Sequence, residues 1–343
     1  MINPEAKLVD NLFDKSKLAF IPTRDGYGLG LIEAGEKDER VVVLCADLTE
    51  STRSLGFAEK FPERFIELGV AEQNMATVAA GLANYGKIPF ISSYAVFSPG
   101  RNNEQIRTTI SLNNLPVKIG GMHAGISVGP DGATHQALED IALMRVQPNM
   151  VVLVPCDAIE AQKVTLAAAF NNKPTYIRFG REKSAVFTTK DTPFEIGKAI
   201  ILRDIKDARP SKAPEERRRV AIIGCGMLLY NALVAAEELS KEGIECTVIN
   251  SHTVKPLDEP AIIEAAKKCG AVVSVEEHQI AGGLGSAIAE CLVRNYPVPQ
   301  EFIGVHDHFG ESGNPDELIE AFGMGISSIK EAVKKAISRK TSG

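Results

Sequence analysis

A glycine-rich loop at residues 120–136 (GGMHAGISVGPDGATHQ) carries the side chains of this sequence that are best suited to chemistry. His123, Asp131 and His135 lie within thirteen residues, among glycines that allow another molecule to approach the backbone closely. Histidine exchanges protons near neutral pH, so the loop suits a polar active site. A structural turn is one alternative, and a metal site built from two histidines and an aspartate is another. The density of glycine favours a loop that approaches a substrate.

Glu72 is a second candidate, in the segment ELGVAEQNM at residues 67–75. It falls in the first turn of a helix that we expect over about residues 71–84, because apolar residues recur there with helical spacing. An acidic residue in a first turn complements the helix dipole. On spacing alone, that structural role is favoured over a catalytic one.

The elements that position these residues follow from an alternation of short β-branched runs with amphipathic stretches between residues 40 and 180. We expect strands near residues 41–44, 88–91, 116–119, 151–154 and 176–177, with further helices at 102–111 and 157–170. Asp157 is the expected N-cap of the last helix. The pattern predicts βαβ units around a parallel sheet, and the loop at 120–136 then follows the carboxyl end of a strand, where such sheets bind ligands.

A second alternation begins after residue 219, with strands expected at 220–223, 246–249 and 271–275 and helices at 228–240 and 261–268. Before it, eleven of the seventeen residues at 203–219 are charged, which predicts an exposed linker. We therefore expect two consecutive α/β domains with mainly parallel sheets: a first domain at 1–190, a linker at 191–219 and a second domain at 220–343.

Composition narrows the class of protein. The 343 residues are 44% hydrophobic with a net charge of −6, which is typical of a globular protein and argues against binding to nucleic acid. No apolar run is long enough to cross a membrane and no secretory signal is visible, so we expect a cytoplasmic location without membrane association. The six cysteines form no C-x-x-C pair and are expected to be buried free thiols.

Common catalytic motifs are missing from the sequence. The glycines at 224–226 and 282–285 do not complete the G-x-G-x-x-G pattern of dinucleotide-binding folds, and they suit close backbone approach instead. No P-loop, H-E-x-x-H or G-x-S-x-G motif occurs. These absences argue against the commonest NTPases, zinc hydrolases and α/β-hydrolases.

A set of longer motifs is more specific. The segment ELGVAEQNM, followed by AAGLANYGKIPFISSYAVF and then DGATHQ, resembles the pyrimidine-binding half of the thiamine-diphosphate-dependent transketolase family. The resemblance continues through QPNMVVLVPCD and IRFGR, and VVSVEEH with GGLGSAIAE resembles the family's C-terminal domain. It covers nearly the whole chain, and it implies a pyrimidine-binding domain followed by a transketolase C-terminal domain.

The resemblance implies roles in cofactor binding and catalysis. Glu72 corresponds to the carboxylate that contacts N1′ of the aminopyrimidine ring and drives the tautomer shift by which thiamine diphosphate loses its C2 proton. Tyr94 and Phe97 correspond to aromatic residues that pack against that ring. His135 corresponds to a hydrogen-bond donor to the oxygens around the reacting carbonyl.

The resemblance also implies the substrate contacts. Phosphate binding falls on Arg24, Ser51 and His123, completed by an arginine of the segment RFGR at residues 178–181. Spacing leaves the choice between Arg178 and Arg181 open, and we favour Arg181 because Arg178 lies on the expected strand. The remaining substrate-binding residue is Asp131, which corresponds to the group that reads the configuration of the donor's hydroxyl groups.

One family motif is absent. Members of the family bind the cofactor diphosphate and Mg²⁺ with a G-D-G motif in a preceding domain, but this sequence contains no G-D-G and begins only about forty residues before Asp47. The resemblance therefore implies the C-terminal subunit of a split transketolase, without metal ligands of its own. An N-terminal subunit would bring the diphosphate and Mg²⁺ site, in a two-plus-two assembly in which this chain also pairs with itself.

The expected activity is transfer of a two-carbon ketol unit between a ketose phosphate and an aldose phosphate. The alternatives within the family are half of a 1-deoxyxylulose-5-phosphate synthase and a β-type subunit of a 2-oxoacid dehydrogenase E1 component. Both use pyruvate and need no hydroxyl reader such as Asp131. An alternative of another class is a non-catalytic regulatory or scaffold subunit, against which the presence of Glu72, Asp131 and both loop histidines argues.

Overall fold

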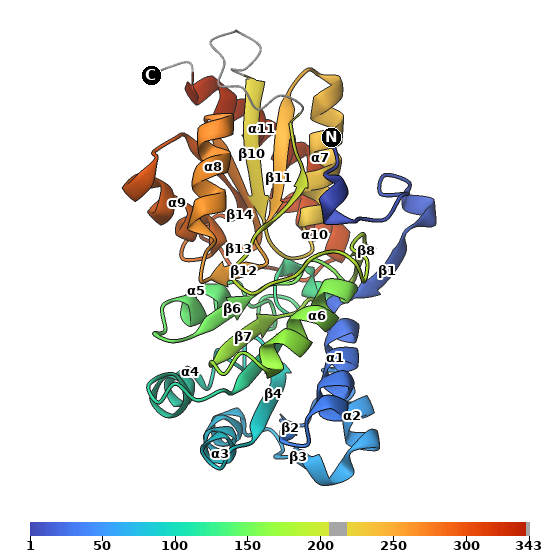
Figure 1. The fold of residues 1–343 in the computed structure, drawn as a ribbon, viewed down its shortest axis with the longest axis vertical. Helices are drawn as coiled ribbons and strands as arrows, with labels where there is room; N and C mark the ends of the chain where they lie inside the picture. Colours follow the sequence, from blue (N-terminus) through green and yellow to red (C-terminus); the bar gives the residue numbers. More distant parts are fainter. Residues whose placement is uncertain (206–217, 341–343) are drawn as a thin grey trace.

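The computed structural model describes residues 1–205 and 218–340, and it divides them between two α/β domains (Figure 1). The first domain, in blue and green, lies below the second, in yellow to red, in Figure 1. The expected fold class is confirmed: most strand pairs in both large sheets are parallel. The charged residues 206–217 of the predicted linker lie outside the described residues.

The first domain is built on a seven-stranded sheet with the order β12-β6-β7-β5-β4-β2-β3. Its strands are β2 (Val41–Cys45), β3 (Phe65–Glu67), β4 (Ile88–Tyr94), β5 (Lys118–Met122), β6 (Val151–Leu153), β7 (Thr175–Arg178) and β12 (Thr253–Lys255). All neighbouring pairs are parallel except β12 with β6. Because these strands are parallel, they end at the same edge of the sheet, and the loops that follow them begin beside one another.

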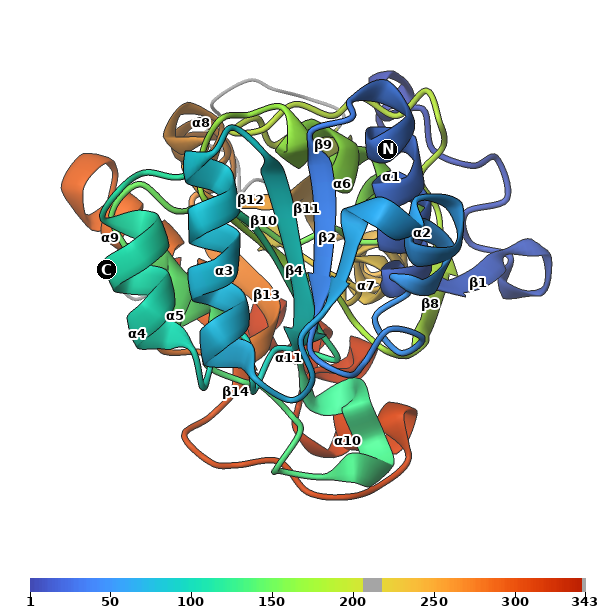
Figure 2. The same ribbon diagram turned by 90° about the horizontal axis from the view of Figure 1, so that it is seen from below.

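Helices cover both faces of this sheet (Figure 2). One face carries α1 (Thr23–Lys37), α2 (Leu55–Lys60) and α6 (Ala158–Ala169). The other carries α3 (Glu72–Asn84), α5 (Asp140–Arg145) and α4 (Asn103–Gln105), which continues as a π-helical turn, η4 (Ile106–Ser111). The predicted helices at 71–84, 102–111 and 157–170 are thus confirmed, and the Asp157 carboxylate caps α6 by accepting a hydrogen bond from the Glu160 amide.

The second domain has a five-stranded sheet with the order β14-β13-β10-β11-β9. The strands are β9 (Ile200–Arg203), β10 (Arg219–Gly224), β11 (Glu245–Asn250), β13 (Val272–Gln279) and β14 (Gln300–Val305). The helices are α7 (Leu229–Lys241), α8 (Glu259–Cys269), α9 (Leu284–Asn295), α10 (Pro315–Ala321) and α11 (Ile326–Lys340). The range 191–219 was predicted as a linker, but it contains β9. Ile200 and Leu202 of this strand are buried, and the strand pairs with β11 in the second sheet.

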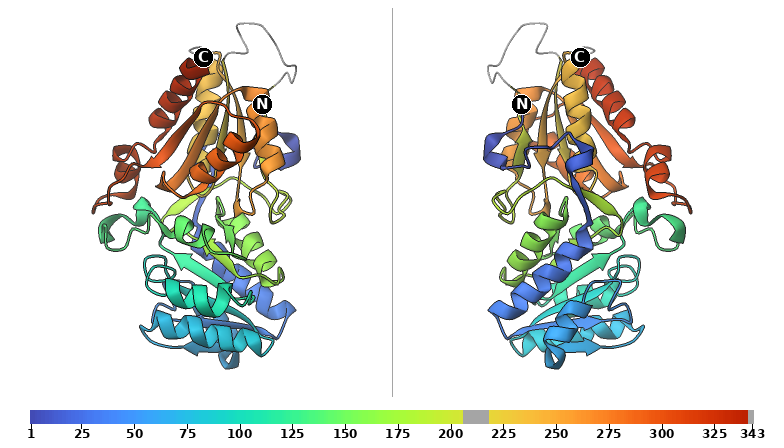
Figure 3. Two further views of the ribbon diagram at one scale, coloured as in Figure 1. Left: turned by 90° about the vertical axis from the view of Figure 1, so that its left-hand side faces the viewer. Right: turned by 90° about the vertical axis from the view of Figure 1, so that its right-hand side faces the viewer.

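The N-terminal segment runs along both domains (Figure 3). It contains η1 (Pro4–Ala6), η2 (Lys15–Lys17) and β1 (Ala19–Pro22), which pairs with β8 (Lys183–Val186). Ala6 and Leu12 belong to the apolar core of the second domain, although the sequence prediction placed them in the first. Ile2, Leu8, Val9 and Leu18 pack against the same core, but apolar residues in a short irregular segment give no local sign of which domain will bury them.

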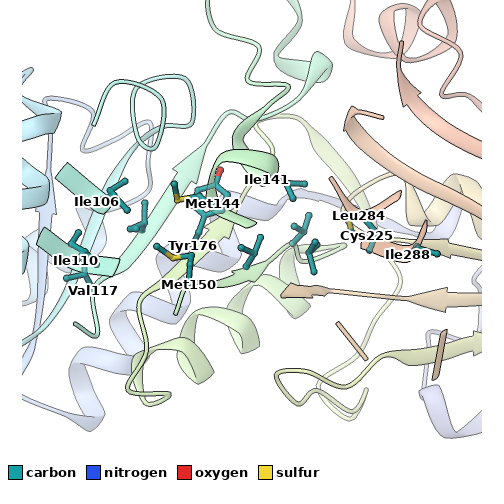
Figure 4. Packing of buried hydrophobic residues seen from close by; sticks show 14 of the residues in the cluster. Ile106, Ile110, Val117, Ile141, Met144, Met150, Tyr176, Cys225, Leu284 and Ile288 are labelled. Atoms are coloured by element: carbon teal, nitrogen blue, oxygen red, sulfur yellow. The ribbon is translucent and has the colours of Figure 1, made fainter. Parts of the chain in front are cut away.

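One apolar cluster crosses from the first domain to the second (Figure 4). Ile106 and Tyr176 contribute to it from the first domain, and Cys225, Leu284 and Ile288 from the second. Because separating the domains would expose this surface to water, burial holds them in one arrangement. All six cysteines are buried and free, as predicted, and no helix of the described residues is long and apolar enough to cross a membrane.

Candidate active site

The predicted site residues gather where parallel strands of the first domain end. Tyr94 is the last residue of β4, His123 follows β5, and Arg181 follows β7 by three residues. Ser51 lies in the loop after β2, and Arg24 is the second residue of α1. Because carboxyl ends of parallel strands share one edge, residues far apart in the sequence meet here.

Glu72 is the first residue of α3 and only 2% of its surface is exposed. Its Oε2 atom accepts a hydrogen bond from Arg101 Nη1 at 2.8 Å, and its main-chain oxygen accepts one from Asn102 Nδ2 at 3.1 Å. The positive end of the α3 dipole also favours a negative charge at this position. The carboxylate is therefore held in one place at the beginning of the helix.

Aromatic rings connect Glu72 to the glycine-rich loop. Arg101 lies over the ring of Phe97, with its guanidinium carbon 4.9 Å from the ring centroid. Phe97 stacks with Tyr94 at a centroid distance of 6.0 Å and meets His135 edge-on at 5.6 Å. Tyr94 in turn lies 4.0 Å from the ring of His123. The structure thus brings the two predicted aromatic residues and both loop histidines together.

His123 and Arg24 form the next contact. Arg24 Nη1 donates to His123 Nε2 at 3.3 Å and to the main-chain oxygen of Ser51 at 2.9 Å. Since arginine only donates, His123 Nε2 accepts and the ring proton lies on Nδ1. Burial, and then the charges of Arg24 and Arg181, lower the pKa of His123 to about 3. The imidazole is therefore neutral at physiological pH.

Two donors of this cluster have no acceptor within residues 1–205 and 218–340. Arg24 Nε and His123 Nδ1 are both buried, and neither has a hydrogen-bond partner among the residues that the structure describes. Buried polar groups nearly always have partners, so two such donors on residues that contact each other indicate a site for an oxygen-rich ligand. His123 also has a φ of 54°, in the left-handed region that is rare for residues with a side chain and frequent at functional sites.

The two candidate arginines of RFGR have different surroundings. Arg178 is 6% exposed and its Nε donates to Asp140 Oδ2 at 2.8 Å, so its charge is already paired. Arg181 is 30% exposed, and its Nη1 donates to Asp131 Oδ1 at 3.2 Å and to the Val128 main-chain oxygen at 3.0 Å. Arg181 rather than Arg178 therefore shares the open cluster with Asp131.

Sequence reasoning missed two cations of the site. Arg101 contacts Glu72 and lies over Phe97 because a turn brings the Arg101 amide to the Phe97 carbonyl at 2.9 Å, and no helical spacing in the sequence indicated this contact. Arg53 lies close enough for its charge to lower the pKa of Arg24, after burial as the larger cause. It follows Ser51 by two residues and pairs with Asp25 at 2.6 Å. The described residues contain no group of three or more His, Cys, Asp or Glu side chains that could hold a metal ion.

Family models match both domains. Residues 20–185 match the transketolase pyrimidine binding domain and residues 211–329 match the transketolase C-terminal domain. The chain belongs to the transketolase family. The resemblance found in the sequence motifs is thereby confirmed, in the order pyrimidine-binding domain and then C-terminal domain.

Several relatives span nearly the same length. A Methanocaldococcus jannaschii protein named for a transketolase C-terminal section is 43% identical over 92% of this chain and 96% of its own. A 6-deoxy-6-sulfo-D-fructose transketolase subunit from a Clostridium species is 40% identical over 92% of this chain and 95% of its own. Human transketolase is 34% identical over 93% of this chain but only 49% of its own, so the chain spans about half of that transketolase.

A solved structure of a transketolase has the same fold. It is described as a split gene transketolase in an inactive beta4 tetramer, and it is 44% identical with a TM-score of 0.84. The match covers 93% of this chain and 99% of that one.

The transketolase family depends on thiamine diphosphate, and the residues here fit the pyrimidine end of that cofactor. The partly exposed rings of Tyr94 and Phe97 offer apolar surface for an aromatic ring, and the Glu72 carboxylate is fixed nearby through Arg101. Thus a flat heterocycle with a protonatable nitrogen matches what these side chains provide.

Proposed function

We propose that this chain is the C-terminal subunit of a thiamine-diphosphate-dependent transketolase that transfers a two-carbon ketol unit from a ketose phosphate to an aldose phosphate. The observation that supports it is the continuous line of contacts from Glu72 through the aromatic rings to Arg24. A buried carboxylate lies at one end, and at the other lie two donors that have no acceptor in the described part of the chain. A cofactor ring, a reacting carbonyl and an anionic sugar tail need groups in that order.

At the cofactor end, thiamine diphosphate supplies a nucleophilic carbon when it is bound. Glu72 would hold the proton shared with the pyrimidine nitrogen, and Tyr94 and Phe97 would pack against the ring. Arg101 fixes the carboxylate by contact with Oε2. Because Arg101 engages Oε2, the other carboxylate oxygen, Oε1, would be the one that contacts the pyrimidine nitrogen.

At the sugar end, Arg24 and His123 would donate to the phosphate, together with Ser51 and Arg181. Because His123 is neutral, it contributes an N–H donor while the arginines contribute the charge. Asp131 would accept hydrogen bonds from the donor's hydroxyl groups, and His135 would donate to the oxygens around the carbonyl. Pyruvate has no hydroxyl groups for Asp131 to read, and this residue therefore favours ketol transfer over the pyruvate-using alternatives; the phosphate contacts alone do not, because glyceraldehyde 3-phosphate also carries a phosphate.

The diphosphate and Mg²⁺ would bind to a partner, the N-terminal transketolase subunit. The sequence has no G-D-G motif for them, and a similar split gene transketolase was solved as an inactive beta4 tetramer. We therefore propose a two-plus-two assembly, in which the pyrimidine end of each site belongs to this chain. The lone chain is then expected to be silent and to bind thiamine diphosphate poorly.

A sulfonate is a second candidate for the sugar tail. A relative that is 40% identical is named as a subunit of a 6-deoxy-6-sulfo-D-fructose transketolase. Sulfonate and phosphate both present three oxygens to hydrogen-bond donors, but phosphate carries more negative charge. The three arginines at positions 24, 53 and 181 favour the more highly charged tail, since their charges all act on His123.

The test combines the chain with its diphosphate-binding partner, thiamine diphosphate and Mg²⁺. Three pairs of substrates are compared: xylulose 5-phosphate with ribose 5-phosphate, 6-deoxy-6-sulfofructose with glyceraldehyde 3-phosphate, and pyruvate with glyceraldehyde 3-phosphate. We expect the first pair to give the highest kcat/KM. If the sulfonate sugar reacts faster, the proposed substrate becomes a sugar sulfonate instead of a sugar phosphate. If only the pair that contains pyruvate reacts, the chain belongs to a pyruvate-using enzyme.

Absence of turnover with every pair, despite assembly and bound cofactor, would support a non-catalytic subunit and contradict the proposal. Titration calorimetry of the lone chain tests the division of labour separately. Micromolar binding of thiamine diphosphate with Mg²⁺, together with ketol transfer in the absence of a second polypeptide, would contradict the split-subunit proposal.

A further inference from the structure

The loop that carries Asp131 is held by the second domain. Its central part is a 3-10 turn, η5 (Ile126–Asp131), and the Ser127 amide at its beginning donates to Glu277 Oε1 at 2.6 Å. Glu277 lies on β13 of the second domain, 150 residues away in the sequence, and is 5% exposed. A buried carboxylate of one domain thus fixes the first turn of a loop that belongs to the other.

Glycine makes this contact feasible. Gly125 has a φ of 94°, and a Cβ atom at that position would lie 2.3 Å from Glu277 Oε1 and 2.4 Å from its Cδ. Any larger residue would therefore displace the carboxylate and strain the backbone. The close approach places Glu277 directly against the backbone at the point where the chain leaves Ala124 and enters η5.

Further contacts from the second domain hold the rest of the loop. Gln136 Nε2 donates to the main-chain oxygens of both Ile126 and Glu311, at 2.9 Å each. A Cβ atom at Gly129 would meet Pro315 at 2.9 Å, and one at Gly132 would meet Ser312 at 2.5 Å. The loop therefore packs against the second domain along its length, and Glu277 is the charged member of that contact.

Glu277 is itself fixed from both sides. Its main-chain oxygen accepts a hydrogen bond from Arg178 Nη2 at 2.8 Å, and Arg178 pairs with Asp140. Burial raises the pKa of Glu277, while the charge of Arg178 and the Ser127 hydrogen bonds act in the opposite direction. Arg178 thus fixes the main chain of Glu277, and the buried carboxylate meets the loop at the Ser127 amide.

We propose that Glu277 is a positioning residue for sugar binding, which sets where η5 begins and so where Asp131 and the Val128 carbonyl stand relative to Arg181. This inference rests on the proposed function, in which Asp131 reads the donor's hydroxyl groups and Arg181 contacts its phosphate. The second domain then contributes to substrate selection through one carboxylate, without touching the substrate.

The neighbouring residue provides a matched control. Glu276 is 1% exposed, and its carboxylate accepts hydrogen bonds from the amides of Leu284 and Gly285, both at 2.7 Å, at the beginning of α9. It has the same side chain and similar burial, but these hydrogen bonds stay within the second domain. Loss of Glu276 therefore measures the structural effect of removing a buried carboxylate from this strand.

The experiment compares Glu277→Ala, Glu277→Gln and Glu276→Ala in the complex with the partner subunit. Steady-state kinetics give the ratio of kcat/KM for xylulose 5-phosphate to that for hydroxypyruvate, which lacks the phosphate and has a carboxylate in place of the hydroxyl-bearing C3 of the ketose. Hydrogen exchange measured by mass spectrometry reports on residues 126–132. We expect Glu277→Ala to lower the ratio at least fivefold and to speed exchange in this loop at least tenfold.

Glu277→Gln should restore both values to within about twofold of the parent, because an amide oxygen can still accept from the Ser127 amide. Glu276→Ala should lower the thermal midpoint while the ratio and the loop exchange stay unchanged. An unchanged ratio in Glu277→Ala, or equal changes in both alanine variants, would overturn the inference. If the parent complex transfers no ketol unit, the proposed function fails, and loop exchange still decides whether Glu277 holds the loop.

Discussion

Two groups of charged residues in this molecule differ in how fully their hydrogen bonds are used. At the seam between the domains, Arg178 donates to Asp140 and to the main-chain oxygens of Ala137 and Glu277, and Tyr176 donates to the same aspartate. At the edge of the first sheet, by contrast, the buried donors Arg24 Nε and His123 Nδ1 have no acceptor among the described residues. The Arg178 and Asp140 group at the seam therefore has its hydrogen-bond partners within the chain, and the Arg24 and His123 group at the edge does not.

The difference separates stability from binding. A buried charge that has all its partners contributes to folding only as a set, because removal of one member leaves the others unpaired. The buried Arg24 Nε and His123 Nδ1 have no partner among the described residues, which reduces stability until a ligand supplies acceptors. Variants at the seam should therefore affect unfolding, and variants at the edge should affect catalysis.

The largest effect is expected at Asp140. Asp140→Ala leaves the buried Arg178 guanidinium without its counter-charge, with main-chain oxygens as its remaining acceptors, and leaves the Tyr176 hydroxyl without its acceptor, which costs about 3–5 kcal/mol of unfolding free energy. The matched control is Asp131→Ala, which removes one partner of the partly exposed Arg181 and should cost about 0–1 kcal/mol. Urea unfolding of both variants measures the contrast, and equal losses would contradict the division between seam and edge.

Glu72→Gln should have the next largest effect, on turnover. An amide cannot exchange the proton that cofactor activation needs, so kcat should fall at least 100-fold, or about 2.7 kcal/mol. Glu160→Gln is the control, since Glu160 is also a buried glutamate in the first turn of a helix but accepts from Asn250 at the seam. Activity of Glu72→Gln within threefold of the parent would refute the catalytic assignment.

The outcome of the sequence predictions follows the same division. Helices α3 and α6 were predictable, because their apolar spacing and the Asp157 cap are local signals. The loop at 120–136 was predictable as polar and strand-following for the same reason. The hydrogen bonds at the seam were not predictable. Tyr176 and Arg178 are 36 and 38 residues from Asp140 in the sequence, and no local periodicity encodes such pairing.

The same limit applies to elements that cross between domains. β12 comes from the second half of the chain, yet it pairs with β6 in the sheet of the first domain. Its three residues form too short a run to reveal a partner about one hundred residues earlier. The roles assigned to the site residues, from Arg24 to Arg181, came from family motifs and remain predictions.

The edge should also separate substrates by charge. His123→Ala or Arg24→Ala removes one donor from the cluster, and a hydrogen bond to a charged group contributes about 1.5–3 kcal/mol. We expect KM for xylulose 5-phosphate to rise at least tenfold, but KM for unphosphorylated hydroxypyruvate to change less than threefold. Steady-state kinetics with both donors measure this, and equal losses would remove the phosphate role from the residue concerned.

The smallest expected effect concerns pH and distinguishes the two regions by sign. Burial, and then the charge of Asp157, raise the pKa of Glu160 at the seam from 4.5 to about 7. The native state therefore keeps a proton that the unfolded state releases, so this group's stabilisation is complete below pH 4.5 and is lost as the pH rises through 7. His123 at the edge has its pKa lowered from 6.5 to about 3, so the stability that its neutral ring contributes to the folded state is lost as the pH falls below 6.5. Glu160→Gln should remove the part of the pH dependence that comes from Glu160. The difference in unfolding free energy between variant and parent should then change by at most about 1.4 kcal/mol per pH unit between pH 5 and 7. Urea unfolding at pH 5.5, 6.0 and 6.5 tests this: the difference between variant and parent should grow with pH in favour of the variant, and parallel stability curves would show that Glu160 is already ionised in the folded protein.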